Sequence, residues 1–235
     1  MNPENSLPRR NLARRLIVTA LVLGVWFWTQ SLIGTRSLPA TGIGDAIHQW
    51  TAPLNSYFYE NLRAANALLI VSSALIDALG LFLLGTWLVG RSVRPFLGLV
   101  LLLSLRQIMQ IICSLPAPPH MVWHYPGFPS LLVTYGVAND YFFSGHTAIA
   151  VFAATQLARF ERRWLTVLGI GVVLFEITMV LVLRAHYTMD VFTGIVTALW
   201  VAVVCDRIAP PVDRFLFRGS NSKAAVSGQT KPGVR

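Results

Sequence analysis

The chain has 235 residues, of which 54% are hydrophobic and only 12% charged, and its mean hydropathy is +0.59. This composition excludes an ordinary soluble domain and predicts a membrane protein. In such a protein, a net charge of +9 favours contact with anionic lipid, and nucleic-acid binding is the poorer explanation.

Six apolar stretches are long enough, or nearly long enough, to cross a hydrocarbon core that needs about 20 helical residues. They predict an all-α integral membrane protein, with six transmembrane helices in one bundle. The spans are expected at 16–34, 64–89, 96–115, 141–158, 164–183 and 188–208. The first stretch is longer than the apolar part of a cleavable signal peptide, so we expect it to be retained.

The remaining sequence divides into two flanking segments. A basic N-terminal segment, 1–15, precedes the predicted membrane domain at 16–208, and a basic, polar tail at 209–235 is predicted to be largely disordered. Placing both termini in the cytoplasm puts 15 of the 19 Lys and Arg residues on that side. The outer face is then periplasmic or lumenal, and the short loops favour a bacterial inner membrane.

Two polar segments stand out: NDYFFSGHT at Asn139–Thr147 and AHYTMDV at Ala185–Val191. The predicted topology places His146, at the start of the fourth span, and His186 and Asp190, between the fifth and sixth, at the same outer face. Ionisable residues at this depth are costly and are usually kept for pairing or function. Either histidine alone could simply cap a helix, but the three groups together favour a site.

The residue types indicate phosphoryl chemistry. His186 and Asp190 are four apart, so on a helix the carboxylate can hold the imidazole in one tautomer, as a nucleophile toward phosphorus. Ser144 and Gly145 are typical of a helix N-terminus, where backbone N–H groups favour phosphate oxygens. We predict that His186 attacks phosphorus to form a phosphohistidine, while His146 acts as general acid and then base. This scheme needs no metal and no cofactor.

The segments NDYFFSGHT and HYTMD resemble the two signatures of the sphingomyelin synthase family, six-span enzymes related to the lipid phosphate phosphatases (PAP2). A looser third match is RQIMQIICSLP at Arg106–Pro116. The resemblance implies a six-helix bundle of the PAP2/sphingomyelin synthase type. It also implies transfer of a headgroup, typically phosphocholine, from a glycerophospholipid to the hydroxyl of ceramide or diacylglycerol, with His146, His186 and Asp190 as catalytic triad.

Two other functions stay open. The phosphatase relatives carry a lysine seven residues before an Arg-Pro pair and an arginine six before the last histidine, but here Trp87 and Val180 occupy these positions. Fewer cations suit a singly charged phosphodiester better than a phosphate monoester. A small transporter could use Asp77, Arg106 and Glu176 to line a path, although the chain shows no inverted repeat.

Several further residues are candidates for substrate contact. Arg106 either grips the phosphate or pairs with Asp77 or Glu176, and Asp140 either attracts a cationic headgroup or stabilises a helix N-terminus. Ser144, Gly145, Tyr141 and Tyr187, within the two segments, are also expected to bind substrate. Trp123, Tyr125, Tyr141 and Phe142 form either a cage for a quaternary ammonium or an interfacial belt. The loop residues His48, His120 and His124 are expected to be solvated.

Overall fold

A computed structural model describes residues 43–90, 92–135 and 141–217, together with four helical positions nearer the N-terminus, Ile17, Leu21, Gly24 and Trp28. The chain divides into two units, Met1–Gly44 and Asp45–Arg235, and the helix bundle belongs to the second. The predicted first span at 16–34, apart from those four positions, lies outside the described residues. So do the N-terminal segment 1–15 and the part of the predicted tail from 218, whereas residues 209–217 of that tail are helical.

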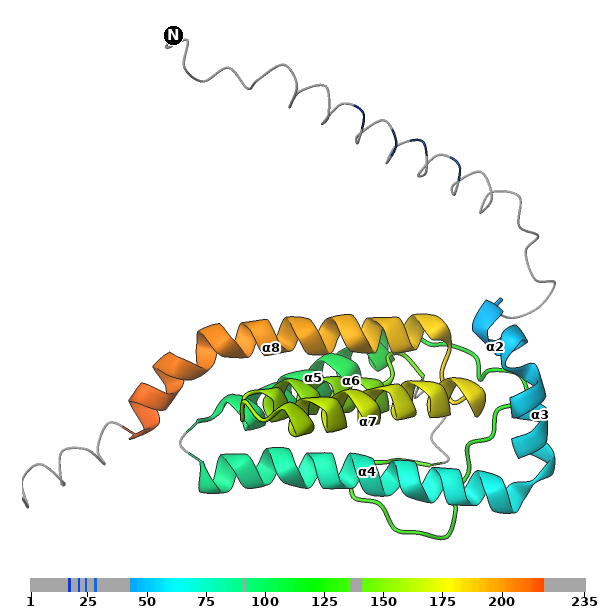
Figure 1. The fold of residues 1–235 in the computed structure, drawn as a ribbon, viewed down its shortest axis with the longest axis horizontal. Helices are drawn as coiled ribbons and strands as arrows, with labels where there is room; N and C mark the ends of the chain where they lie inside the picture. Colours follow the sequence, from blue (N-terminus) through cyan, green and yellow to red (C-terminus); the bar gives the residue numbers. More distant parts are fainter. Residues whose placement is uncertain are drawn as a thin grey trace, which may run out of the picture. The chain divides into compact units, whose positions relative to one another are not determined.

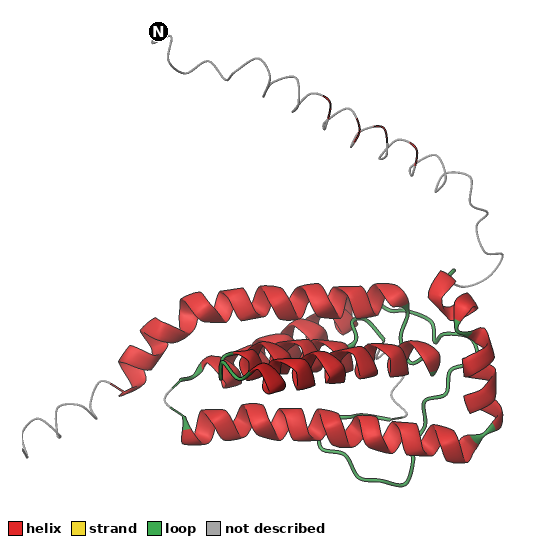
Figure 2. Cartoon of the chain, viewed as in Figure 1, coloured by secondary structure: helices red, strands yellow, loops and turns green. Residues whose placement is uncertain are grey.

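Every regular element in the described part of the second unit is a helix (Figure 2). The helices are α2 (Ala46–Trp50), α3 (Ala52–Glu60), α4 (Leu62–Val89), α5 (Arg94–Ile112), α6 (Gly145–Ala158), α7 (Arg163–Val182) and α8 (Thr188–Phe217). Four of them, α4, α5, α7 and α8, are long and apolar enough to cross a membrane. The prediction of an all-α membrane protein is confirmed, whereas four helices rather than six meet the requirements for a span in the described part.

The predicted fourth span, 141–158, is wrong as a membrane-crossing helix. In its place stands α6, which begins only at Gly145 and has 14 residues, a rise of about 21 Å against a core of about 30 Å. It packs against all four long helices (Figure 1), and 10 of its residues are buried. Its apolar sequence reflects enclosure by protein rather than by lipid.

The long helices present apolar side chains outward. Leu81 on α4, Ile111 on α5, Val167 on α7 and Trp200 on α8 are between 55% and 83% exposed. Large exposed apolar surfaces are unusual on a soluble protein and mark an interaction with lipid or protein. We take these faces as the surface that the hydrocarbon core covers.

Glycines set how closely α5 and α8 approach α6. A Cβ at Gly98 would lie 1.9 Å from Cζ of Phe152, and a Cβ at Gly194 would lie 2.8 Å from the carbonyl oxygen of Ser144. Either contact is far too short for a real side chain, so only glycine permits this packing. Gly194 therefore fixes the distance between α8 and the N-terminus of α6.

Arg94 organises one end of the bundle. Its guanidinium donates to Asp206 at 2.8 Å and to the side chain of Gln156. Gln156 lies at the C-terminal end of α6, about 15 Å along the helix from His146. The Arg94-Pro95 pair, which matches the arginine and proline of the phosphatase motif, thus lies at the opposite end of α6 from His146.

Candidate functional site

A pocket of about 60 Å³ lies where α6 begins. It is lined by Ile76, Leu103, Arg106, Trp123, Leu132, Val133, Thr134, Tyr141, Gly145, His146, Ile149, Ala185 and His186. The two predicted catalytic histidines thus line one pocket, although they come from α6 and from the turn between α7 and α8. The antiparallel course of the helices brings these segments to the same end of the bundle.

His186 is held in one tautomer by a backbone carbonyl. Its Nδ1 lies 2.8 Å from the carbonyl oxygen of Tyr141, and a carbonyl can only accept, so Nδ1 carries the hydrogen and Nε2 the lone pair. The carboxylate of Asp190 is 3.8 Å from Nδ1, beyond hydrogen-bond distance, and its Oδ2 accepts instead from the amide of Tyr187 at 2.9 Å. The predicted carboxylate–imidazole hydrogen bond is replaced by one to Tyr141, with Asp190 as a neighbouring charge.

His146 occupies the first turn of α6 and is 8% exposed. The hydroxyl of Ser144 caps this turn by accepting from the amide of Thr147 at 3.4 Å. The ring meets Trp123 edge-on, with centroids 5.2 Å apart, and its Nε2 is buried without a hydrogen-bond partner among the described residues. A buried, unpaired nitrogen is costly, so a group that enters the pocket would gain by pairing with it.

Arg106 reaches the start of α6 from α5. Its Nε donates to the carbonyl of Phe143 at 3.1 Å, and a Cβ at Gly145 would lie 3.0 Å from the same Nε. The absence of a side chain at Gly145 therefore lets the guanidinium lie against the helix N-terminus. This geometry places a cation in the wall of the pocket.

The carboxylates that were alternative partners for Arg106 have other contacts. Asp77 accepts from the hydroxyl of Ser130 and from the amides of Leu131 and Leu132, each at 2.9 Å. Glu176 accepts from the hydroxyl of Ser72 at 2.7 Å. Asp77 thus anchors the loop that follows α5, and Glu176 links α7 to α4.

The other predicted substrate-binding residues separate into two groups. Tyr141 and Gly145 line the pocket, whereas Ser144 and Tyr187 are buried and do not. Tyr187 stacks on His48 with centroids 5.6 Å apart, and burial raises the pKa of its phenol. Asp140 lies outside the described residues.

Aromatic side chains from the loop after α5 meet at the pocket. Trp123 lies against Tyr135, with centroids 5.1 Å apart, and Tyr135 contacts Tyr125 at 6.1 Å. The indole Nε1 of Trp123 donates to the carbonyl of Thr134 at 3.2 Å, which fixes the ring. Trp123 and Tyr141 are thus pocket residues, while Tyr125 is 59% exposed.

Asp45 and His48 also lie near the site, although the sequence did not predict this. His48 is buried, so its predicted solvation is wrong, and its Nε2 lies 2.9 Å from the carbonyl oxygen of His186. Asp45 accepts from the amide and the hydroxyl of Thr188 at 2.6 and 2.8 Å. Burial alone would raise the pKa of Asp45, but the bonds from Thr188 and the neighbouring His48 outweigh it and hold the pKa below its usual 3.8.

Across the described residues, no three His, Cys, Asp or Glu side chains are arranged to hold a metal ion. The ionisable groups around the pocket are instead two imidazoles, one carboxylate and one guanidinium. Two imidazoles can pass a proton and attack phosphorus, and a guanidinium can bind phosphate oxygens.

The fold and this site define a class: an integral membrane protein with a pocket at one end of a helix bundle, where a short central helix begins and two histidines and an arginine meet. Comparison with known families then assigns it more closely. The family model AtPDCT1/2, of the phosphatidylcholine:diacylglycerol cholinephosphotransferases, matches residues 45–209, and the chain belongs to this family. No curated protein and no solved structure matches it.

The match corrects the family suggested by the motifs. The matched range includes both NDYFFSGHT and HYTMD, but the family is the cholinephosphotransferases. The assignment to the sphingomyelin synthase and PAP2 families is therefore wrong, and ceramide as acceptor loses its support. The two segments carry histidines and a carboxylate, residue types that can serve phosphoryl transfer on either scaffold. Short motifs therefore indicated the chemistry without distinguishing the family.

Proposed function

We propose that the protein transfers phosphocholine from phosphatidylcholine to diacylglycerol. The family match supports this substrate pair. The observation that carries the mechanism is that His146 and His186 line one pocket, with the Nδ1 of His186 engaged by Tyr141 so that Nε2 holds the lone pair. The two alternative functions, phosphatidate phosphatase and transport, have no comparable support.

In the proposed first step, Nε2 of His186 attacks phosphorus and the bond to the diacylglycerol oxygen breaks. His146, protonated when the anionic phosphate lies beside it, gives that oxygen a proton, and diacylglycerol leaves. In the second step a new diacylglycerol hydroxyl passes its proton to His146 and attacks phosphorus, and the P–N bond breaks. One phosphate ester is exchanged for another of the same type, so the reaction needs no energy source.

The positive and aromatic walls of the pocket suit a phosphocholine group. Arg106 is placed to bind the phosphate oxygens, and the ring of Trp123 offers a face of the kind that attracts a quaternary ammonium. The pocket is smaller than the roughly 300 Å³ or more of typical small-molecule sites. The headgroup phosphate therefore enters it, and the acyl chains stay along the apolar faces of the long helices.

The proposal is tested with purified protein in vesicles that hold headgroup-labelled phosphatidylcholine and diacylglycerol of distinct acyl chains. We expect label in phosphatidylcholine that carries the new chains, and a labelled His186 adduct when diacylglycerol is left out. His186→Ala should lose both, while His124→Ala, a histidine in the loop after α5 that contacts Asn66, should keep them. Inorganic phosphate released from phosphatidic acid would instead favour the phosphatase, and inertness toward both lipids would favour transport.

We also propose that the pocket opens on the outer side and that both termini are cytoplasmic, because the basic loops lie at the other end of the bundle. Two cysteines test this orientation. Cys113, partly exposed at the C-terminal end of α5, should react with a membrane-impermeant thiol reagent added outside, while the buried Cys205 should not. Labelling of Cys113 only from the cytoplasmic side would reverse the orientation. The family match gives no support to a bacterial inner membrane, which stays a prediction.

A further inference from the structure

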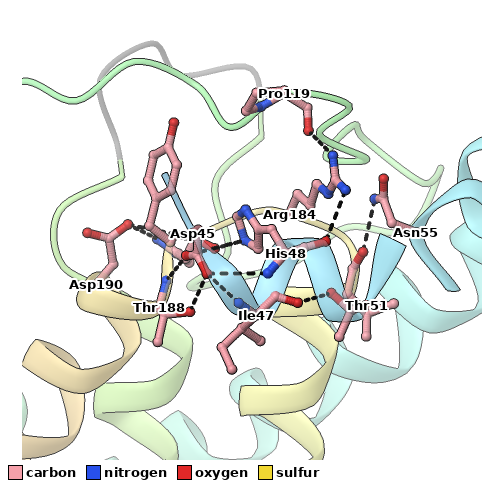
Figure 3. Close-up of polar contacts among 12 residues, drawn as sticks. Asp45, Ile47, His48, Thr51, Asn55, Pro119, Arg184, Thr188 and Asp190 are labelled. Atoms are coloured by element: carbon pink, nitrogen blue, oxygen red, sulfur yellow. Dashed lines mark hydrogen bonds and ion pairs between the residues drawn. The ribbon is translucent and has the colours of Figure 1, made fainter. Parts of the chain in front are cut away.

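The segment that carries His186 is held by contacts from the start of the second unit. Between α7 and α8, the chain turns at Arg184, with φ of 53°, and the amide of Ala185 returns to the carbonyl of Val180 at 2.9 Å. The next three residues, 186–188, are contacted by Asp45, the N-cap residue of α2, and by His48, in the first turn of α2 (Figure 3). We call this set of bonds the α2–α8 contact.

Asp45 joins two helix N-termini. Its Oδ1 accepts from the amide of Ile47 at 3.0 Å, which caps α2, and its two oxygens accept from the hydroxyl and amide of Thr188, which opens α8. The first N–H groups of a helix have no partner within it, and a carboxylate there also meets the positive end of the helix dipole. Asp45 thus fixes the start of α8 relative to α2.

His48 completes the contact at the backbone of the candidate nucleophile. Because a carbonyl can only accept, Nε2 of His48 donates to the oxygen of His186 at 2.9 Å. The carbonyl of His48 in turn accepts from Arg184 at 3.1 Å, and a second nitrogen of that guanidinium donates to the carbonyl of Pro119 at 2.9 Å. Both sides of His186 are therefore tied to α2.

We propose that Asp45 and His48 are positioning residues for His186: the α2–α8 contact holds its backbone so that Nε2 stays aimed at the phosphorus in the pocket. Neither residue lines the pocket, so each acts through His186 rather than on the substrate. This inference rests on the role of His186 in the proposed function. A side chain anchored at Nδ1 by Tyr141 and through its backbone by α2 has little freedom left, as a nucleophile requires.

The first test is Asp45→Asn, which keeps the size of the side chain but removes its charge and one acceptor. We expect kcat for headgroup transfer to fall about 10- to 100-fold, since displacements near 1 Å can cost that much. The KM for phosphatidylcholine should change far less, because the pocket walls are intact. Thr188→Val, which removes only the hydroxyl bond to Asp45, should show the same pattern more weakly.

The matched control is Asp213→Asn at the opposite end of the bundle. Asp213 accepts from a backbone amide, that of Val93, at 2.6 Å and from the hydroxyl of Ser92 at 2.8 Å, so its bonds mirror those between Asp45 and Thr188. It should lose a comparable amount of thermal stability while kcat stays within about twofold. Equal losses of kcat in both variants would mean that the effect of Asp45 is one of stability alone, and would overturn the proposal.

His48 offers a rescue test. His48→Gln supplies an amide N–H that can reach the carbonyl of His186, and His48→Leu supplies none. A positioning role predicts that Gln retains most of the kcat and that Leu loses it. Loss in both would mean that the imidazole itself is required, and retention in both would mean that its bond to His186 is dispensable; either outcome overturns the role given to His48.

Hydrogen exchange separates this inference from the proposed function. In Asp45→Asn, the amide of Thr188 should exchange faster than in the wild type and in Asp213→Asn, whatever reaction the protein catalyses. If the wild type transfers no headgroup but Thr188 is deprotected only in Asp45→Asn, the contact stands and the proposed reaction fails. If transfer is intact in the wild type and neither kcat nor exchange changes in Asp45→Asn, the positioning role is refuted.

Discussion

Gly194 gives a direct test of the alignment between the two histidines. It lies on α8 against Ser144, the residue that caps α6, and a Cβ there would be 2.8 Å from the Ser144 carbonyl oxygen. Ordinary contact begins near 3.4 Å, so Gly194→Ala must separate α6 from α8 by about 0.6 Å at this point. The amide of Ser144, which donates to the carbonyl of Asp190 at 3.2 Å, would move with it.

The two expected effects differ in kind. Overpacking costs about 1–3 kcal/mol, and the better helix propensity of alanine returns about 0.5–1 kcal/mol, so the free energy of unfolding should fall by at most about 2.5 kcal/mol. The shift also carries His146 away from His186. Because a displacement near 1 Å can cost about 100-fold in rate, about 0.6 Å should lower kcat roughly 10-fold or more.

The assay is headgroup transfer in vesicles, with thermal unfolding measured on the same samples. Gly171→Ala on α7, where nothing lies within 4 Å of a new Cβ, should keep its activity. Gly98→Ala, which would meet the ring of Phe152, a residue that does not line the pocket, should lose stability but keep the activity of the folded fraction. If Gly194→Ala turned over as fast as Gly171→Ala, the spacing of α6 and α8 would not control the reaction.

Three single contacts lead to further predictions. Glu176→Gln should leave the free energy of unfolding within about 1 kcal/mol, because the amide can still accept from Ser72, whereas Glu176→Leu leaves that hydroxyl unpaired and should cost about 1–3 kcal/mol in detergent melts. Trp123→Ala should raise the KM for phosphatidylcholine about 10-fold and Trp123→Phe much less, if the indole binds the ammonium; equal effects would exclude this role. The pKa of Asp45 lies below its usual 3.8 in the folded protein. The ionised carboxylate therefore stabilises the fold fully above pH 3.8, and this stabilisation is lost as the pH falls through the lower pKa of the folded state. Protection of the Thr188 amide, corrected for intrinsic exchange, should therefore hold down to about pH 5; loss near neutral pH would contradict the assignment.

Hydropathy located the helices that face lipid. The predictions for 64–89, 96–115, 164–183 and 188–208 each overlap one long helix, because a lipid-facing helix must be apolar over its whole length. The same measure failed at 141–158, since a helix enclosed by four others is just as apolar without having to span the bilayer. It also missed α2 and α3, whose short, mixed sequences carry no such signal.

The ionisable residues of the pocket were predictable because the alternating course of the helices forces His146 and His186 to one end. Their orientation was not predictable. The partner of Nδ1 is the backbone carbonyl of Tyr141, which any residue at that position would supply. The contact between Asp45 and Thr188 joins positions 143 residues apart, and nothing in either local sequence marks the other.

The size of the pocket bears on the order of the proposed reaction. A pocket of about 60 Å³ is narrow for two lipid headgroups, so we expect the donor and acceptor lipids to use it in turn. An enzyme that exchanges a headgroup between two lipids must then keep the headgroup while one glycerolipid replaces the other. A covalent bond to an imidazole fixed on both sides does this, and Nε2 of His186 is the nitrogen whose lone pair is available for it. The narrow pocket and the held nucleophile thus favour the same two-step exchange, in which the diacylglycerol that leaves and the one that enters use a single site in turn.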